Sequence, residues 1–182
     1  MSLDEGLLRL ARTRGHTPVA ERAVARFSML GEHAGFWLAL GMAESLLSNG
    51  ERRARWRRST AVVAGTYAAN TALKLVVRRV RPELPGLPPL TGTPTRLSFP
   101  SAHSSTSFAA ALAFRRAGLP AAPLYALAGG LALSRLYLGV HYPSDVLAGA
   151  LLGHAIAVAF GPRADAEVVG SQSVGSTLAT AL

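Results

Sequence analysis

The chain contains no cysteine, so a disulfide framework, a thiolate nucleophile and a cysteine-ligated metal are all excluded. Lysine is almost as scarce, since Lys74 is the single lysine among 19 basic residues. Acidic residues are also few in the second half, where Asp145 is the only one between Glu83 and Asp165. Isolated residues against so strong a compositional bias indicate a chemical role for Lys74 and Asp145.

Charge of either sign is sparse. Charged residues make up 16% of the chain, against roughly 25% in soluble domains, and the mean hydropathy is +0.27. The net charge of +9 raises the possibility of a nucleic-acid partner. However, the arginines cluster in short runs between apolar segments, which is typical of loops between membrane spans. We therefore expect a bilayer as the partner and no nucleic acid.

Five apolar segments predict helices. They cover about residues 28–48, 60–77, 102–117, 121–138 and 143–160, and most are near the ~17–25 residues that cross a bilayer. The predicted fold is an all-α transmembrane bundle of five to six helices in a single domain. A soluble helical bundle is the alternative, because helices buried in a large core have a similar composition.

The flanking and connecting segments predict a simple organisation. Residues 1–26 are expected to form an amphipathic segment that lies at the membrane interface or on a solvated surface. Residues 27–162 form the membrane-embedded domain, and the small, polar residues 163–182 are expected to be a disordered tail. The basic run at 51–58, ERRARWRR, is predicted to be a cytoplasmic loop. The proline-rich residues 83–99 are predicted to be a second loop.

Three short motifs carry the chemistry. They are Lys74-x6-Arg81-Pro82, then Pro100-Ser101-Ala102-His103, then Ser134-Arg135-x5-His141-x3-Asp145. When the chain is followed through alternating spans, all three motifs reach the same membrane face. Because hydropathy is assigned without regard to the motifs, this agreement predicts a single site.

The residue types fit a phosphate group. Lys74, Arg81 and Arg135 can form a cationic clamp, in which the planar arginine fork suits phosphate oxygens and lysine acts as a point charge. Ser101 and the backbone N–H groups of the helix that follows it can add neutral donors. A clamp and a nucleophile held in line are what phosphoryl transfer requires.

Two histidines and one carboxylate supply the reacting groups. His141 and Asp145 are four residues apart, so they share one face if a helix begins near them. The carboxylate can then accept the Nδ1 proton and leave Nε2 free to attack phosphorus. His103 remains as the general acid for the leaving oxygen and then as the base for water. The cationic clamp opposes a divalent cation, so we expect no metal and no cofactor.

The remaining histidines and arginine doublets have simpler interpretations. We interpret His16, His33 and His154 as capping or surface residues. Arg78, Arg79 and Arg115 are interpreted as ordinary loop charge.

The three motifs, over about residues 60–160, resemble those of the type 2 phosphatidic acid phosphatase (PAP2) superfamily. It includes lipid phosphate phosphatases, undecaprenyl pyrophosphate phosphatases and vanadium haloperoxidases. The resemblance implies a six-helix core and the roles argued above: Lys74, Arg81, Ser101 and Arg135 for phosphate, His103 as acid, His141 as nucleophile and Asp145 as its orienting partner. The family usually has glycine where this chain has Ala102. Alanine still permits close backbone approach, so Ala102 is retained among the expected phosphate-binding residues.

The expected function is that of an integral membrane, metal-independent lipid phosphate phosphatase that forms a phosphohistidine intermediate. Its expected location is a bacterial inner (plasma) membrane, with the site on the extracytoplasmic face. The favoured substrate is a polyprenyl-linked phosphate of cell-envelope synthesis, and the resemblance extends to short members that act on decaprenylphosphoryl-5-phosphoribose. The alternatives are a polyprenyl pyrophosphate phosphatase, a phosphatidic acid or phosphatidylglycerophosphate phosphatase, a vanadate-dependent haloperoxidase, and a non-catalytic lipid-phosphate binding protein.

Overall fold

The computed structural model describes residues 2–163, and it is built from helices. The elements are α1 (Leu3–Thr13), α2 (Pro18–Ser28), the 3-10 helix η1 (Met29–Ala34), α3 (Gly35–Leu47), α4 (Gly50–Val77), α5 (Ala102–Arg116), α6 (Ala121–Tyr137) and α7 (Pro143–Phe160). Within 2–163, the β structure is one isolated bridge between Val80 and Leu97. The predicted all-α bundle is therefore confirmed. The tail predicted for 163–182 lies, apart from Arg163, outside the described residues.

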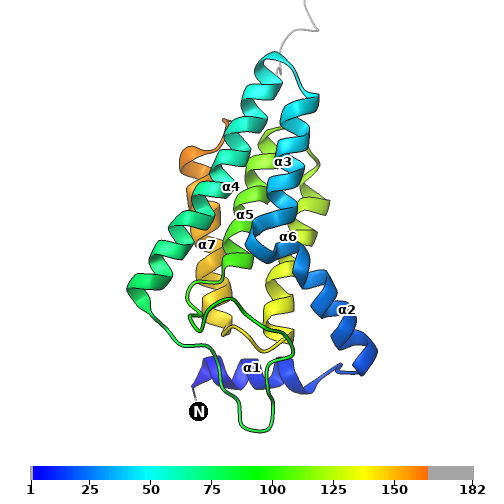
Figure 1. Cartoon of the computed structure of the whole chain (residues 1–182), viewed down its shortest axis with the longest axis vertical. Helices are drawn as coiled ribbons and strands as arrows, with labels where there is room; N and C mark the ends of the chain where they lie inside the picture. The colour runs from blue at the N-terminus through cyan, green and yellow to red at the C-terminus, as the bar shows by residue number, and fades with distance from the viewer. Residues whose placement is uncertain (1, 164–182) are drawn as a thin grey trace, which may run out of the picture.

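Helices α3 to α7 run along the long axis of the molecule, and α1 lies across one end (Figure 1). Helix α5 occupies the centre and contacts α3, α4, α6 and α7. The five apolar segments predicted as helices are all helical, with η1 and α3 together covering the first of them. In the N-terminal segment, residues 14–17 separate α1 from α2.

The basic run at 51–58 is not a loop, so that prediction was wrong. It forms the first two turns of α4, which begins at Gly50 after the N-cap residue Asn49. Arginine and alanine are good helix formers, so nothing in the run ends a helix. Trp56 is also fully buried, with its ring centroid 5.0 Å from that of Phe114 on α5. Burial of this one aromatic side chain fixes the run as a packed helix.

Small residues allow α5 and α7 to pack closely. Residues 109–113 of α5 are buried, and four of the five are alanine. On α7, Gly149 and Gly153 are four residues apart and face the α5 backbone. A Cβ atom at Gly153 would lie 1.9 Å from the carbonyl oxygen of Ser105, and one at Gly149 would lie 2.5 Å from that of Ser101. This small-xxx-small spacing is typical of helix pairs in membranes.

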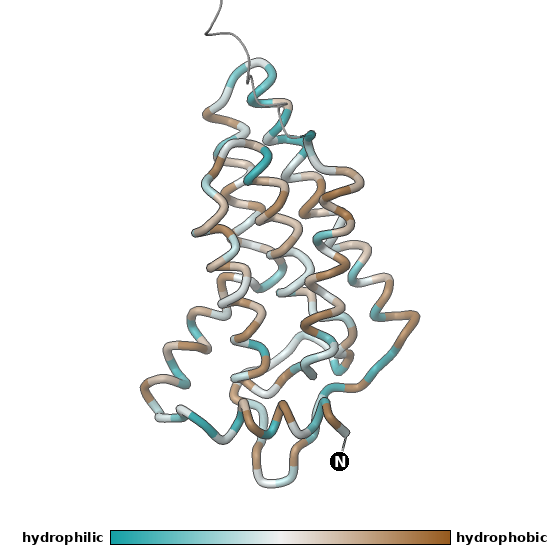
Figure 2. Tube along the Cα trace, turned by 180° about the vertical axis from the view of Figure 1, so that it is seen from behind, coloured by the Kyte–Doolittle hydropathy of each residue, from teal (hydrophilic) through white to brown (hydrophobic). Residues whose placement is uncertain are grey.

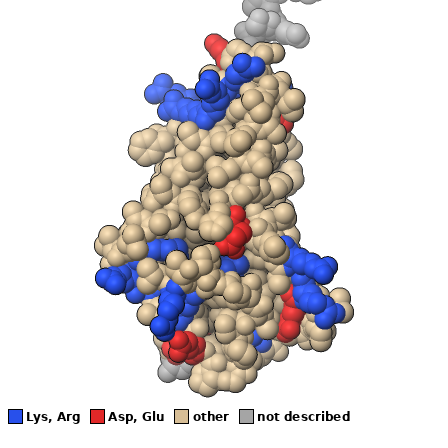
Figure 3. Space-filling model, viewed as in Figure 1, with Lys and Arg blue, Asp and Glu red and all other residues tan. Residues whose placement is uncertain are grey.

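The outer surface of the bundle suits a bilayer. Apolar residues line the middle of the bundle, and hydrophilic residues gather toward its two ends (Figure 2). On the face in Figure 3, an uncharged band separates the charged side chains at the upper end from those in the lower half. Large apolar side chains point outward from the helices, among them Leu133, Leu147, Leu151 and Val158. Two helices of the described chain, α4 and α7, are long and apolar enough to cross a membrane by themselves.

We expect Gly153→Ala to destabilise the α5–α7 pair. The added Cβ would collide with the Ser105 carbonyl, so one helix has to move away from the other. The free energy of unfolding should fall by about 1–3 kcal/mol, as overpacking typically costs. Thermal unfolding in detergent measures the change. Gly129→Ala on α6 is the matched control, because no atom lies within 4 Å of its added Cβ. Equal melting temperatures for the two variants would contradict this account.

Candidate active site

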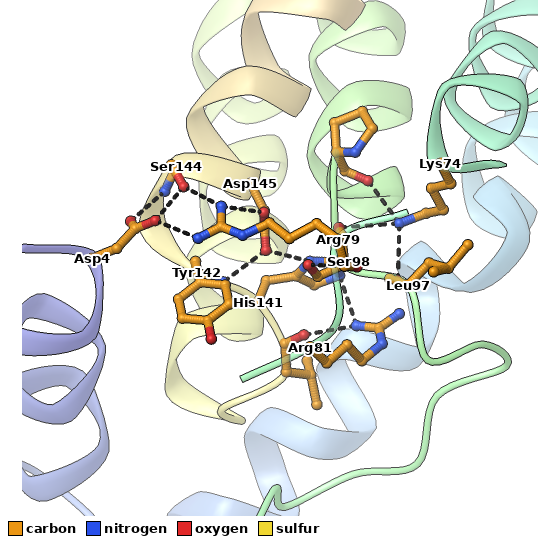
Figure 4. A network of polar contacts seen from close by, with 12 residues as sticks. Asp4, Lys74, Arg79, Arg81, Leu97, Ser98, His141, Tyr142, Ser144 and Asp145 are labelled. Atoms are coloured by element: carbon orange, nitrogen blue, oxygen red, sulfur yellow. Dashed lines mark hydrogen bonds and ion pairs between the residues drawn. The ribbon is translucent and has the colours of Figure 1, made fainter. Parts of the chain in front are cut away.

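The three motifs meet at the end of the bundle that α1 covers (Figure 1), and Figure 4 shows residues of the first and third motifs there. The contributing positions are Lys74 on the last turns of α4, Arg81 on the following loop, Ser101 at the N-cap of α5, Arg135 on the last turn of α6, and His141 just before α7. The prediction that one end of the bundle collects all three motifs is confirmed. The fold does this because α4 and α6 end where α5 and α7 begin.

His141 and Asp145 are close, although they do not share a helical face as predicted. Helix α7 begins at Pro143, so His141 precedes it. The fully buried Asp145 is in the first turn, and its Oδ2 accepts a hydrogen bond of 2.9 Å from the backbone N–H of Tyr142. Nδ1 of His141 lies 3.4 Å from the same oxygen. Nδ1 makes no hydrogen bond among the described residues, so the two atoms are close but not hydrogen-bonded.

Arg81 determines which nitrogen of His141 carries a lone pair. Its Nη1 lies 3.0 Å from Nε2 of His141 and donates to the carbonyl oxygen of Val140 at 2.7 Å. Because arginine only donates, Nε2 is the acceptor, and the ring proton is on Nδ1 toward Asp145. Burial and the nearby positive charges of Arg81 and Lys74 hold the pKa of His141 well below its usual value. The ring is therefore neutral at neutral pH, as a nucleophile has to be.

Lys74 binds backbone rather than lying open to the site. Its Nζ donates to the carbonyl oxygens of Leu97, Ser98 and Pro100 at 3.4, 3.1 and 2.8 Å. All three lie within the four residues that precede Ser101. Lys74 therefore holds the segment that leads to the second motif, and its charge lies next to the site.

Several buried polar atoms at the site have no hydrogen-bond partner in the described chain. They include Oγ of Ser101, Oγ of Ser104, Nε of Arg135 and Nδ1 of His141. Ser101 is the N-cap residue of α5, but its side chain makes no capping hydrogen bond. Ala102 is the first residue of that helix. Buried polar groups are normally paired, so a cluster of unpaired ones at a helix N-terminus fits an anionic ligand.

Ser28, at the end of α2, contacts two of the predicted site residues and was not anticipated. Its carbonyl oxygen lies 3.0 Å from Nε2 of His103, and its Oγ accepts a hydrogen bond of 2.6 Å from Arg135. Gly31 leaves room for the ring, because a Cβ there would lie 2.5 Å from Cδ2 of His103. The α2–η1 segment therefore holds the predicted acid and one predicted phosphate ligand. Sequence carried no signal for this contact, because Ser28 lies 75 residues from His103.

Arg79 was interpreted as loop charge, and that interpretation was wrong. Its Nη1 donates to Oδ1 of Asp145 at 3.0 Å, and its Nη2 donates to Oδ2 of Asp4 at 2.8 Å. By contrast, Arg78 and Arg115 are exposed. The three histidines assigned outside the site do lie outside it. His16 stacks on Tyr137, His33 bonds the hydroxyl of Tyr67, and His154 is exposed.

Comparison with known proteins agrees with this geometry. Residues 56–162 match the family model described as the PAP2 superfamily. The chain belongs to the PAP2 superfamily. It is also 48% identical, over 132 residues, to a protein of Mycolicibacterium smegmatis named decaprenylphosphoryl-5-phosphoribose phosphatase. That match covers 70% of this chain and 68% of the relative.

Two solved PAP2 structures share the fold. The crystal structure of Aquifex aeolicus LpxE matches with a TM-score of 0.72 at 24% identity, over 87% of this chain and 94% of LpxE. The transmembrane PAP2-type phosphatidylglycerolphosphate phosphatase of Bacillus subtilis matches with a TM-score of 0.70 at 22% identity, over 86% and 82%. The chain is thus a PAP2 phosphatase, and it shares its fold with a transmembrane member of the superfamily.

We expect the thermal stability of the ligand-free PAP2 protein to fall as the pH drops below about 6.5, the ordinary pKa of histidine. Below that pH the unfolded chain takes up a proton at His141, whereas the folded protein does not, because the pKa of the buried ring is depressed. The loss at this group approaches about 1.4 kcal/mol per pH unit. Melting temperatures in detergent between pH 5 and 8 measure it.

His141→Gln should reduce this pH dependence, because the variant has no ring to protonate at this position. His154→Gln is the control, since His154 is exposed on α7. A His141→Gln protein that keeps the full wild-type slope would show that another group carries the effect.

Proposed function

We propose that this PAP2 phosphatase hydrolyses a polyprenyl-linked phosphomonoester without a metal and through a phosphohistidine at His141. The main support is that His141 is buried and neutral, with Nε2 of its ring 3.0 Å from Nη1 of Arg81. The favoured substrate is decaprenylphosphoryl-5-phosphoribose. Its support is the 48% identity to a relative named for that substrate.

The proposed reaction has two steps. His103 has to be protonated for the first step, and the negative charge of the bound phosphate favours that form. Nε2 of His141 attacks phosphorus, the bond to the ester oxygen breaks, and the protonated His103 gives that oxygen its proton. Asp145 orients the ring and stabilises its positive charge. In the second step, His103 takes a proton from water, which attacks phosphorus and breaks the P–N bond.

The phosphate oxygens have donors within reach. Arg81 and Arg135 supply guanidinium groups, Lys74 supplies charge, and Ser101 with the first N–H groups of α5, from Ala102 onward, supplies neutral donors. Every one of these ligands is a donor or a cation. A divalent metal would be repelled by this set, so the charge of the phosphate is balanced by the protein itself.

Substrate choice is tested with purified protein and a panel of lipid phosphates. We expect phosphate release from a polyprenylphosphoryl-5-phosphoribose to exceed release from a polyprenyl pyrophosphate, phosphatidic acid and phosphatidylglycerophosphate. EDTA should leave the rate unchanged. A preference for the pyrophosphate or a glycerolipid would overturn the substrate assignment. Bromide oxidation by the vanadate-treated protein, without phosphate release, would favour the haloperoxidase alternative.

The intermediate is tested with a ³²P-labelled substrate and rapid acid-free quenching. We expect a base-stable, acid-labile label on the wild-type protein and none on His141→Asn. His154→Asn is the matched control and should be labelled like the wild type. Labelling of His141→Asn would sink the assignment of the nucleophile.

We also propose that the protein lies in a bacterial inner (plasma) membrane with the active-site end extracytoplasmic. The support is the arginine-rich start of α4 at the opposite end of the bundle, since positive residues favour the inside. Because the chain has no cysteine, Gly92→Cys and Glu51→Cys, both exposed, can be labelled on intact cells. An impermeant thiol reagent should modify Gly92→Cys alone. Modification of Glu51→Cys alone would invert the topology.

A further inference from the structure

Asp4, on the N-terminal helix, reaches the first turn of α7. Its Oδ1 accepts a hydrogen bond of 2.9 Å from the backbone N–H of Ser144, and its Oδ2 accepts one from the Ser144 hydroxyl. The N–H of Ser144 belongs to the first turn of a helix, where backbone donors have no partner within the helix. A carboxylate there is also favoured by the helix dipole. Asp4 therefore caps α7 from another helix, 140 residues away in sequence.

The same carboxylate holds Arg79. The guanidinium of Arg79 lies between two carboxylates, with Nη2 on Asp4 and Nη1 on Asp145, and it donates to the Ser144 hydroxyl at 2.6 Å (Figure 4). Its central carbon also lies 4.0 Å from the ring centroid of Tyr142. Asp145 is thus held by an arginine on one side and by a capped helix turn on the other. Asp4 contributes to both, because it bonds Arg79 and also caps the first turn of α7 at Ser144.

Helix α1 is fixed in place at its other end as well. Asp4, Leu8 and Arg12 are spaced four residues apart and lie on one face of the helix. Leu8 is fully buried. The buried Arg12 donates to the carbonyl oxygens of Tyr137 and Pro88 at 3.1 and 2.7 Å. These contacts orient α1 so that Asp4 faces α7.

We propose that Asp4 and Arg79 are positioning residues for the reaction, and that α1 is therefore a working part of the active site. They act through Asp145: Arg79 fixes Oδ1, so that Oδ2 is left to face Nδ1 of His141. The inference rests on the role proposed for Asp145 in orienting His141.

The bonding of the site's cations separates Arg79 from the phosphate clamp. Among the site's cations in the described chain, Arg79 is the one that forms salt bridges, and its partners are Asp4 and Asp145. Arg81 and Arg135 instead bond carbonyl oxygens, a ring nitrogen or a hydroxyl. Phosphate can displace a neutral acceptor, because a charge-assisted hydrogen bond is stronger. Arg79 already pairs with two carboxylates, so we expect it to bind phosphate less readily than Arg81 or Arg135 does.

The charge states suit this arrangement. Burial raises the pKa of Asp4, but hydrogen bonds from Ser144 and Arg79 outweigh it and hold the pKa below its usual value. Burial lowers the pKa of Arg79, and the hydrogen bond to Asp4 with the charge of Asp145 raises it above the usual value. The pair therefore stays ionised across the pH range in which the enzyme is assayed.

Asp4→Asn and Arg79→Gln test the proposal in the full-length protein. We expect kcat to fall roughly tenfold and roughly a hundredfold, as displacement of a reacting group by about an ångström does. KM should stay within about twofold, because neither side chain reaches the phosphate-binding groups. Glu5→Gln on α1 and Arg78→Asn are the matched controls, and both should keep wild-type kcat. Asp4→Glu, which restores the charge, should recover part of the loss.

The decisive measurement repeats Asp4→Asn in an Asp145→Asn background. If Asp4 acts through Asp145, the added substitution lowers the residual kcat by less than about twofold. An equal tenfold loss in both backgrounds would make Asp4 merely structural, and unchanged kcat in Asp4→Asn would also overturn the proposal. Should Asp4→Asn melt too low for assay, Arg79→Gln is read by the same comparison. Failure of the phosphatase mechanism is separate, since His141→Asn would then remain active.

Discussion

Burial of the Asp145 carboxylate is the constraint on which the site depends. Taking a carboxylate out of water costs several kcal/mol unless cations and hydrogen bonds compensate. Here the compensation comes from Arg79 on one oxygen and the Tyr142 N–H on the other. The backbone carbonyl of Asp145 in turn accepts the N–H of Ser101 at 3.0 Å, so that the second and third motifs are joined at this residue. Without the negative charge of Asp145, no buried carboxylate of the described chain would offset the repulsion among Arg79, Arg81 and Lys74 around His141.

The helix packing makes this arrangement possible. A histidine before α7 can reach an arginine after α4 only if the helix ends approach closely, and the glycines of α7 allow the α5 backbone within van der Waals contact. The buried alanines of α5 likewise leave room for neighbouring helices to pack closely against it. The face of α5 toward α7 therefore contributes backbone contact, whereas Phe114 of the same helix packs against Trp37 and Trp56. Other large apolar side chains, among them Leu133, Leu147 and Leu151, point outward, where lipid would surround them in a bilayer.

Sequence predicted the parts of this structure that depend on local pattern. Apolar runs located the helices, and motif spacing brought Lys74, Ser101, Arg135 and His141 to one end. It failed where a long-range contact decides the outcome. The run at 51–58 was assigned to a loop because the buried contact of Trp56 with Phe114 has no local signature. Arg79 was passed over because its carboxylate partners lie 66 and 75 residues away.

The cations of the site bond acceptors that a phosphate can replace. Arg81 donates hydrogen bonds to carbonyl oxygens and to Nε2 of His141. Lys74 donates to three carbonyl oxygens, and Arg135 donates to the Ser28 hydroxyl. Each of these acceptors is neutral, so a phosphate dianion offers a stronger partner at every position. Arrival of phosphate at Arg81 would also free Nε2 of His141, the proposed nucleophile. In the proposed mechanism, substrate binding therefore also activates the nucleophile, while Arg79, bonded to two carboxylates, would keep Asp145 in place.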